Sequence, residues 1–169
     1  MVLFIPYFST FILRSPKMKS LSVVRRVAIF GLFLLSTAVF AADFGDHSSS
    51  TLTTKAWNAL GAQNYDDALA CINKCLELYE GKALEMQAAL KEYAPADSAA
   101  KMWALNDVGT CLFIKGELLV KKGDLKSAKE AYQRVFKEFK FAQTWDTKGW
   151  FWKPAEAAKQ KFVELGVDL

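Results

Sequence analysis

The sequence has few of the residues from which catalytic and metal sites are usually built. It holds one histidine and three cysteines among 169 residues. His47 lies in a polar stretch, where we expect it to be solvated. Cys71 and Cys75 are four residues apart on a predicted helix, but Cys111 is the only further thiol, and a zinc site normally needs four ligands. The sequence therefore predicts no metal, no cofactor and no catalytic residue.

The cysteines also make a poor disulfide framework, because their number is odd. A bond between Cys71 and Cys75 would strain their helix. We expect buried free thiols, with a Cys75–Cys111 bridge between neighbouring helices as the alternative. The sequence also lacks a P-loop, a dinucleotide-binding fingerprint and a serine–histidine pair, so nothing in it points to the enzyme classes that use these motifs.

The N-terminal segment has the pattern of an export signal. Three basic residues precede an apolar stretch at 27–40, which ends in small residues at Ala41. This pattern predicts a signal peptide at 1–41, cleaved after Ala41, and a periplasmic or secreted protein. An uncleaved membrane anchor is the alternative, although the stretch is shorter than the about 20 apolar residues of a membrane span. Met18 is a candidate true start.

Removal of this segment changes the charge of the protein. The whole chain carries 22 basic and 18 acidic residues, a net charge of +4. Residues 1–41 contain five of the basic residues and no acidic one, so 17 basic residues remain against 18 acidic ones and the net charge becomes −1. We therefore expect no nucleic-acid partner, since such binding needs a basic surface, and membrane contact only through the segment before cleavage.

The rest of the chain lacks an alternating pattern long enough for a strand, and its apolar residues recur at helical spacing. A flexible polar arm is predicted at 42–52, followed by one helical domain at 53–169. Apolar residues step by three and four from Tyr65 to Tyr93. This stripe predicts one long helix that passes through Gly81, with a break at Gly81 as the alternative.

Three further helices are predicted after this one. The first starts near Asp97 and is apolar on most sides, so we expect it at the centre of the domain. On it, Gly109 and Gly116 share one stripe, where they would let another helix approach closely. The next helix follows the N-cap Asp124, and the last begins at Pro154 and caps the domain. With the helix that precedes Tyr65, the sequence predicts an all-α fold of about five helices.

Small residues recur at matching gaps in two parts of the chain. In each part, one small residue is followed by a second after 12 residues and by a third after a further seven. The two sets are Ala56, Ala68 and Cys75, and Gly116, Ala128 and Val135. This spacing resembles that of the tetratricopeptide repeat (TPR), in which small side chains let two antiparallel helices pack tightly. The resemblance covers about 52–79 and 112–139.

The resemblance implies a TPR-like fold of antiparallel helical hairpins with a C-terminal capping helix. It also implies a non-enzymatic scaffold that binds a protein or peptide, or that associates with itself. One departure is the distance of 60 residues between the two sets, because the usual period is about 34 residues.

Aromatic residues gather in the stretch FAQTWDTKGWFWKP at 141–154. Residues 146–149 read as a turn, and 150–152 as an extended segment, because the residue before a proline avoids helical geometry. One interpretation is a lid that closes the open end of the helix stack. The other is an exposed platform for a sugar or a peptide. Both interpretations use the same residues, Trp145, Trp150, Phe151 and Trp152.

This stretch is similar to the Trp-rich tail of small exported bacterial TPR-like proteins, some of which are labelled β-glucanases. Glycoside hydrolysis needs two carboxylates about 5–9.5 Å apart. Asp146 and Glu156 are the only acids near the tryptophans, one on a turn and the other on a helix. We therefore expect no glycosidase activity and keep a carbohydrate-binding or glycan-acting envelope protein as the alternative function.

Overall fold

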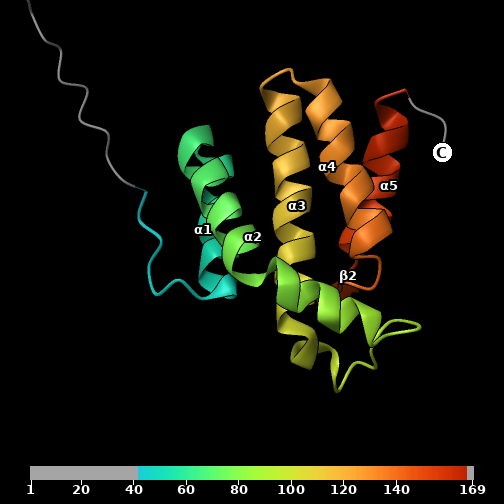
Figure 1. The fold of residues 1–169 in the computed structure, drawn as a ribbon. Coiled ribbons are helices and arrows are strands. Elements are labelled where there is room, and N and C mark those ends of the chain that lie inside the picture. The colour runs from blue at the N-terminus through green and yellow to red at the C-terminus, as the bar shows by residue number, and fades with distance from the viewer. Residues whose placement is uncertain (1–41, 167–169) are drawn as a thin grey trace, which may run out of the picture. The chain divides into compact units, whose positions relative to one another are not determined.

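The computed structural model describes residues 42–166, and the predicted signal segment lies outside them. Within this range the chain forms five α-helices and one two-stranded sheet (Figure 1). The elements are α1 (Ser49–Gly61), α2 (Tyr65–Ala88), the 3-10 helix η1 (Ala99–Met102), α3 (Trp103–Lys121), α4 (Leu125–Glu138), β1 (Thr144–Asp146), β2 (Trp150–Trp152) and α5 (Pro154–Glu164). The predicted TPR-like helical class is confirmed, whereas the expectation of no strand was wrong.

α1 begins inside the predicted polar arm, 42–52, rather than after it. The hydroxyl of Ser48 accepts a hydrogen bond from the backbone N–H of Thr51 at 3.3 Å and so caps the helix. The Tyr79 hydroxyl donates to the carbonyl of His47 at 2.8 Å. The arm is therefore shorter than predicted, and α2 holds its end in place.

The helices pack as two antiparallel pairs, α1 with α2 and α3 with α4, and α5 covers α4 (Figure 1). α3 lies at the centre, because it contacts α1, α2, α4 and α5. The six small residues of the repeat spacing are all buried: Ala56, Ala68, Cys75, Gly116, Ala128 and Val135. Small side chains at these places let the backbones of each pair come close together, as the TPR resemblance implies.

The closest approach is at the two glycines of α3. A Cβ atom on Gly116 would overlap the ring of Tyr132 on α4, which is fully buried. A Cβ on Gly109 would lie 2.7 Å from the Cβ of Ala142, in the segment that follows α4. The predicted approach of another helix is confirmed at Gly116, whereas the neighbour of Gly109 is a non-helical segment.

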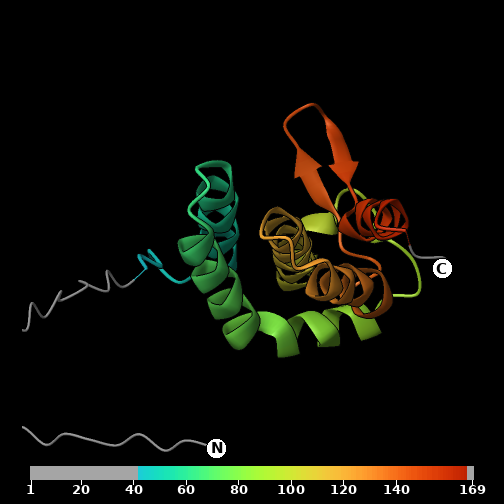
Figure 2. The same ribbon diagram turned by 90° about the horizontal axis from the view of Figure 1, so that it is seen from above.

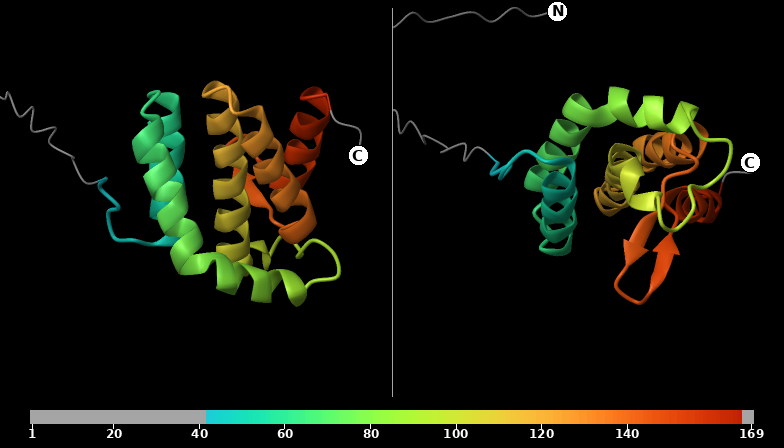
Figure 3. Two further views of the ribbon diagram at one scale, coloured as in Figure 1. Left: turned by 45° about the horizontal axis from the view of Figure 1, so that its top comes forward. Right: turned by 90° about the horizontal axis from the view of Figure 1, so that it is seen from below.

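α2 runs through Gly81 without a break but ends at Ala88, before the predicted end at Tyr93. Figures 1 and 3 show that it bends sharply, so that its C-terminal part crosses toward α4. There the side-chain oxygen of Gln87 accepts a hydrogen bond from the backbone N–H of Phe141 at 2.9 Å. The ring of Tyr93 packs against that of Phe141, with centroids 5.6 Å apart. These contacts with a residue distant in sequence keep the chain after Ala88 from continuing the helix.

The next predicted helix also starts differently. The segment near Asp97 first forms η1, and α-helical geometry begins only at Trp103. Asn106 explains the delay, because its side-chain amide donates to the carbonyl of Ala99 at 2.9 Å and holds η1 against the first turn of α3. This arrangement places Trp103 at the junction of the two helices.

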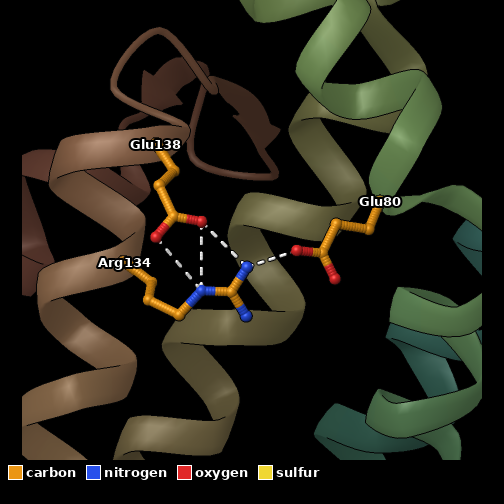
Figure 4. Close-up of polar contacts among 3 residues, drawn as sticks. All are labelled: Glu80, Arg134 and Glu138. Atoms are coloured by element: carbon orange, nitrogen blue, oxygen red, sulfur yellow. Dashed lines mark hydrogen bonds and ion pairs between the residues drawn. The ribbon is translucent and has the colours of Figure 1, made fainter.

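An ion-pair network links the bent helix α2 to α4 (Figure 4). Arg134 of α4 pairs with Glu80 of α2 and donates three hydrogen bonds to Glu138, at 2.8–3.2 Å. All three side chains are partly exposed to solvent. We therefore assign the network about 1 kcal/mol of stability at most, which makes it a minor contribution beside the packing of the core.

The three cysteines lie in the core as free thiols, two on α2 and one on α3. A hydrogen bond with Cys75, together with burial, raises the pKa of Cys111 well above its usual value. Burial also raises the pKa of Cys71. Among the described residues, none of the helices combines the length and the hydropathy that a membrane span requires.

We expect Gly116→Ala to destabilise the protein by about 1–3 kcal/mol, because the added methyl group overpacks against the buried ring of Tyr132. This loss outweighs the gain of about 1 kcal/mol in helix propensity. Gly81→Ala is the matched control, since its new Cβ would meet nothing within 4 Å, and we expect it to be neutral or stabilising. Urea unfolding followed by circular dichroism measures both. A tolerated Gly116→Ala would contradict the close contact between α3 and α4.

Candidate functional site

The Trp-rich segment folds into a β-hairpin that projects from the helices (Figure 2), here termed the Trp hairpin, residues 144–152. Its antiparallel register pairs Thr144 with Trp152, Trp145 with Phe151, and Asp146 with Trp150. The backbone N–H of Gly149 donates to the carbonyl of Asp146 at 2.9 Å, and Gly149 has a φ of +90°, which favours glycine. The predicted turn and the predicted extended segment are both confirmed.

The side chains of the Trp hairpin alternate between two faces. Two clefts adjoin the hairpin, and Thr144 and Trp145 line both. Trp145 and Phe151 form a cross-strand pair, with ring centroids 5.0 Å apart, beside the first cleft. On the other face, Trp152 lies 5.0 Å from the ring of Phe113 and 6.4 Å from that of Trp57. We name the two spaces the Trp103 cleft and the Trp57 cleft after their helical aromatic residues.

The aromatic residues of this segment do not share one environment. Trp152 and Phe151 are half-buried, whereas Trp145 is 61% exposed and Trp150 is 51% exposed. The lid interpretation therefore fits Trp152, which packs on Phe113 of the core. It was wrong for Trp145 and Trp150, because the hairpin carries them away from the helices.

Buried amide groups fasten the root of the Trp hairpin to the helices. The side-chain oxygen of Asn106, on α3, accepts a hydrogen bond from the backbone N–H of Gln143 at 2.9 Å. The side chain of Gln143 donates to the carbonyl of Ala94 at 2.6 Å. Both amide side chains are buried, and a buried polar group that is paired fixes its neighbours in place. The hairpin, α3 and the segment before η1 are thus held as one unit.

The Trp103 cleft has a volume of about 500 Å³, within the range of sites that hold ligands. Its apolar lining is formed by Ala96, Ala99, Ala100, Trp103, Trp145 and Phe151. Trp103 is 43% exposed. The ring of Tyr79, on α2, packs edge-to-face against it with centroids 5.5 Å apart. The cleft therefore offers aromatic surface that is open to solvent but held in position.

Of the described residues, Asp107 is the only charged one that lines this cleft. The hydroxyl of Ser49, on α1, donates a hydrogen bond to its Oδ2. Burial raises the pKa of the Asp107 carboxyl above its usual value, and the bond from Ser49 only partly opposes this shift. The site thus places a poorly solvated carboxylate beside exposed aromatic rings.

The comparisons with known proteins agree with this architecture. The tetratricopeptide repeat family model matches residues 110–138, which include most of α3 and all of α4. The chain is TPR-like. No curated protein and no solved structure matches it. The match coincides with the second unit that the spacing of small residues predicts, at 112–139.

The Trp57 cleft of this TPR-like protein adjoins the Trp103 cleft at Trp145 and measures about 410 Å³. Its lining includes Asp146, one of the two carboxylates considered for hydrolysis. Asp146 accepts a hydrogen bond from the backbone N–H of Lys148 at 2.7 Å, so it shapes the turn. Glu156, the other carboxylate, is on α5 and pairs with Lys153 at 3.3 Å. Each carboxylate therefore has a local structural role.

The sequence analysis missed Trp103, Asp107 and Asn106. In the sequence, Trp103 is one more apolar residue of a predicted central helix, and no local pattern indicates its exposure. The one available signal is the pair of adjacent polar residues, Asn106 and Asp107, near the start of a helix that is apolar on most sides. Polar residues in a buried helix point to a network or a site, because their burial costs free energy unless they are paired.

We expect Asp107→Asn to raise the thermal stability near neutral pH. Burial raises the pKa of Asp107 above its unfolded value, so the ionised carboxyl disfavours the native state at pH above that pKa. The penalty disappears as the pH falls through the raised pKa, because the native state then takes up the proton. Thermal melts from about pH 7 to about pH 4 should show an advantage for the variant that shrinks toward acid. An advantage that grows toward acid would contradict this.

Proposed function

We propose that this chain is an exported, non-enzymatic interaction module that binds a protein or peptide partner at the Trp hairpin and the Trp103 cleft. The observation that carries the proposal is the exposure of Trp103 and Trp145 on either side of an apolar cleft. Tryptophan is among the residues that contribute most to protein interfaces. The tetratricopeptide repeat match supports a protein-interaction scaffold. Export rests on the signal pattern at 1–41.

The attachment of the hairpin also favours binding. The amide groups of Asn106 and Gln143 fix its root, and the ring of Tyr79 packs edge-to-face against Trp103. A surface that is already ordered loses little conformational entropy when a partner docks. An exposed aromatic patch on a fixed scaffold is therefore better explained by a partner than by chain flexibility.

We expect a photo-crosslinking amino acid at position 145 to trap a discrete protein partner in cells. The matched control is the same amino acid at position 125, where Leu125 is 46% exposed on α4, away from both clefts. Mass spectrometry of the adducts identifies the partner, and an adduct of two copies of this chain would assign the surface to self-association. Equal trapping at both positions, or none at 145, would contradict the proposal.

A carbohydrate-binding protein is the second candidate, and the exposure of Trp150 favours it. Flat aromatic rings such as Trp150 and the rim residue Trp57 suit stacking on a sugar. Titration with soluble β-glucan oligomers, followed by tryptophan fluorescence, separates the candidates. We expect no shift in emission for the interaction module, whereas a saturable shift that is lost in Trp150→Ala would favour the carbohydrate function.

A further inference from the structure

We infer that the Trp103 cleft receives an arginine side chain of the partner, with its guanidinium group between the aromatic rings and the carboxylate of Asp107. This inference rests on the proposed function, because it takes the partner to be a protein or peptide. It adds the chemistry that selects the partner, which neither the repeat match nor the fold specifies.

The first argument is the charge of the cleft. Two other partly buried acidic side chains have basic partners: Glu80 pairs with Arg134, and Glu117 lies 4.0 Å from a nitrogen of Lys161. Among the described residues, no basic side chain lines the Trp103 cleft or pairs with Asp107. Its one hydrogen-bond partner there is the neutral hydroxyl of Ser49. The cleft thus lacks the positive charge that its carboxylate would bind.

The second argument is the nature of the walls. Trp103 and Trp145 expose 43% and 61% of their surfaces, and the face of an indole ring attracts cations, arginine more often than lysine. A guanidinium group is flat, so it can stack on a ring while its N–H groups point at a carboxylate. Both features of the cleft therefore favour the same side chain.

The third argument is that the polar side chain next to Asp107 in sequence is already occupied. The amide of Asn106 is bonded at both ends, to Ala99 and to Gln143, so it does not compete for the guanidinium group. Small residues such as Ala96 and Ala100 leave room for the aliphatic stem. A neutral apolar side chain would fill the same space, but it would remove water from Asp107 without supplying a partner.

The test uses two probes that differ only in charge. One is the blocked pentapeptide Gly-Leu-Arg-Leu-Gly, and the other has citrulline, the neutral isostere of arginine, at its centre. We titrate both into the purified protein and follow the indole N–H signals of Trp103 and Trp145 by NMR. We expect the arginine peptide to bind at least ten-fold more tightly and to shift these two signals rather than that of Trp57.

Two aspartate variants test whether the carboxylate of Asp107 causes the preference for the arginine peptide. In Asp107→Asn, we expect the difference between the peptides to fall below about two-fold, since a ten-fold difference corresponds to about 1.4 kcal/mol of charge-dependent binding. Asp66→Asn is the control, because Asp66 is an exposed residue in the first turn of α2, and it should keep the full difference. If circular dichroism shows that Asp107→Asn is unfolded, Trp145→Ala replaces it and should weaken the arginine peptide at least five-fold.

The outcomes separate this inference from the proposed function. Equal binding of both peptides at the cleft overturns the arginine inference but leaves the interaction module in place. An arginine preference that survives in Asp107→Asn overturns it as well. If the arginine peptide does not bind at all, the inference fails, and the crosslinking yield at position 145 decides whether the proposed function fails with it.

Discussion

The hydrogen bond from the backbone N–H of Gln143 to the side chain of Asn106 is the contact on which the site depends. The chain leaves α4 at Glu138 and must be turned before it enters β1 at Thr144. A buried, fully paired amide on the central helix provides this turn with a fixed point. Without it, the root of the hairpin would lose its attachment to α3, and Trp145 and Phe151 would be held less firmly beside Trp103.

The packing of the helical pairs brings Gln143 and Asn106 close enough to form this hydrogen bond. Because Gly116 has no side chain, α4 can pack closely on α3. For the same reason Gly109 leaves room for Ala142, which directly precedes Gln143. The bend of α2 carries its C-terminal part to the same place, where Gln87 bonds Phe141. Three separate stretches of chain thus converge at the root of the hairpin. The repeat packing is therefore also what positions the site, through contacts between residues far apart in sequence.

The sequence was sufficient for features that depend on local spacing. Steps of three and four predicted the helices, the predicted N-cap at Asp124 is formed by its side chain, and the turn at 146–149 followed from its residues. The features that it missed depend on distant contacts. α2 ends early because Phe141 engages its end, and strands of three residues are too short to give an alternating pattern.

The candidate site also combines features that local sequence predicts with features that depend on contacts between distant residues. The aromatic stretch at 141–154 was found from composition, but the exposure of Trp145 and Trp150 follows from the projection of the hairpin. Asp107 could not be identified as part of the site, because η1 and the hairpin form the rest of the cleft around it. A helical pattern assigns residues to faces of one helix, and it does not say which loop will cover each face.

Amide hydrogen exchange followed by NMR tests the central contact most directly. If the bond to Asn106 fixes the hairpin, the Gln143 N–H should exchange as slowly as the core amides of α3, such as Leu112. Its exchange should accelerate by at least about 100-fold in Asn106→Ala, which corresponds to about 2.8 kcal/mol and lies within the cost of an unpaired buried group. A Gln143 amide that exchanges, in the unmodified protein, as fast as an exposed amide without a hydrogen bond would contradict this account.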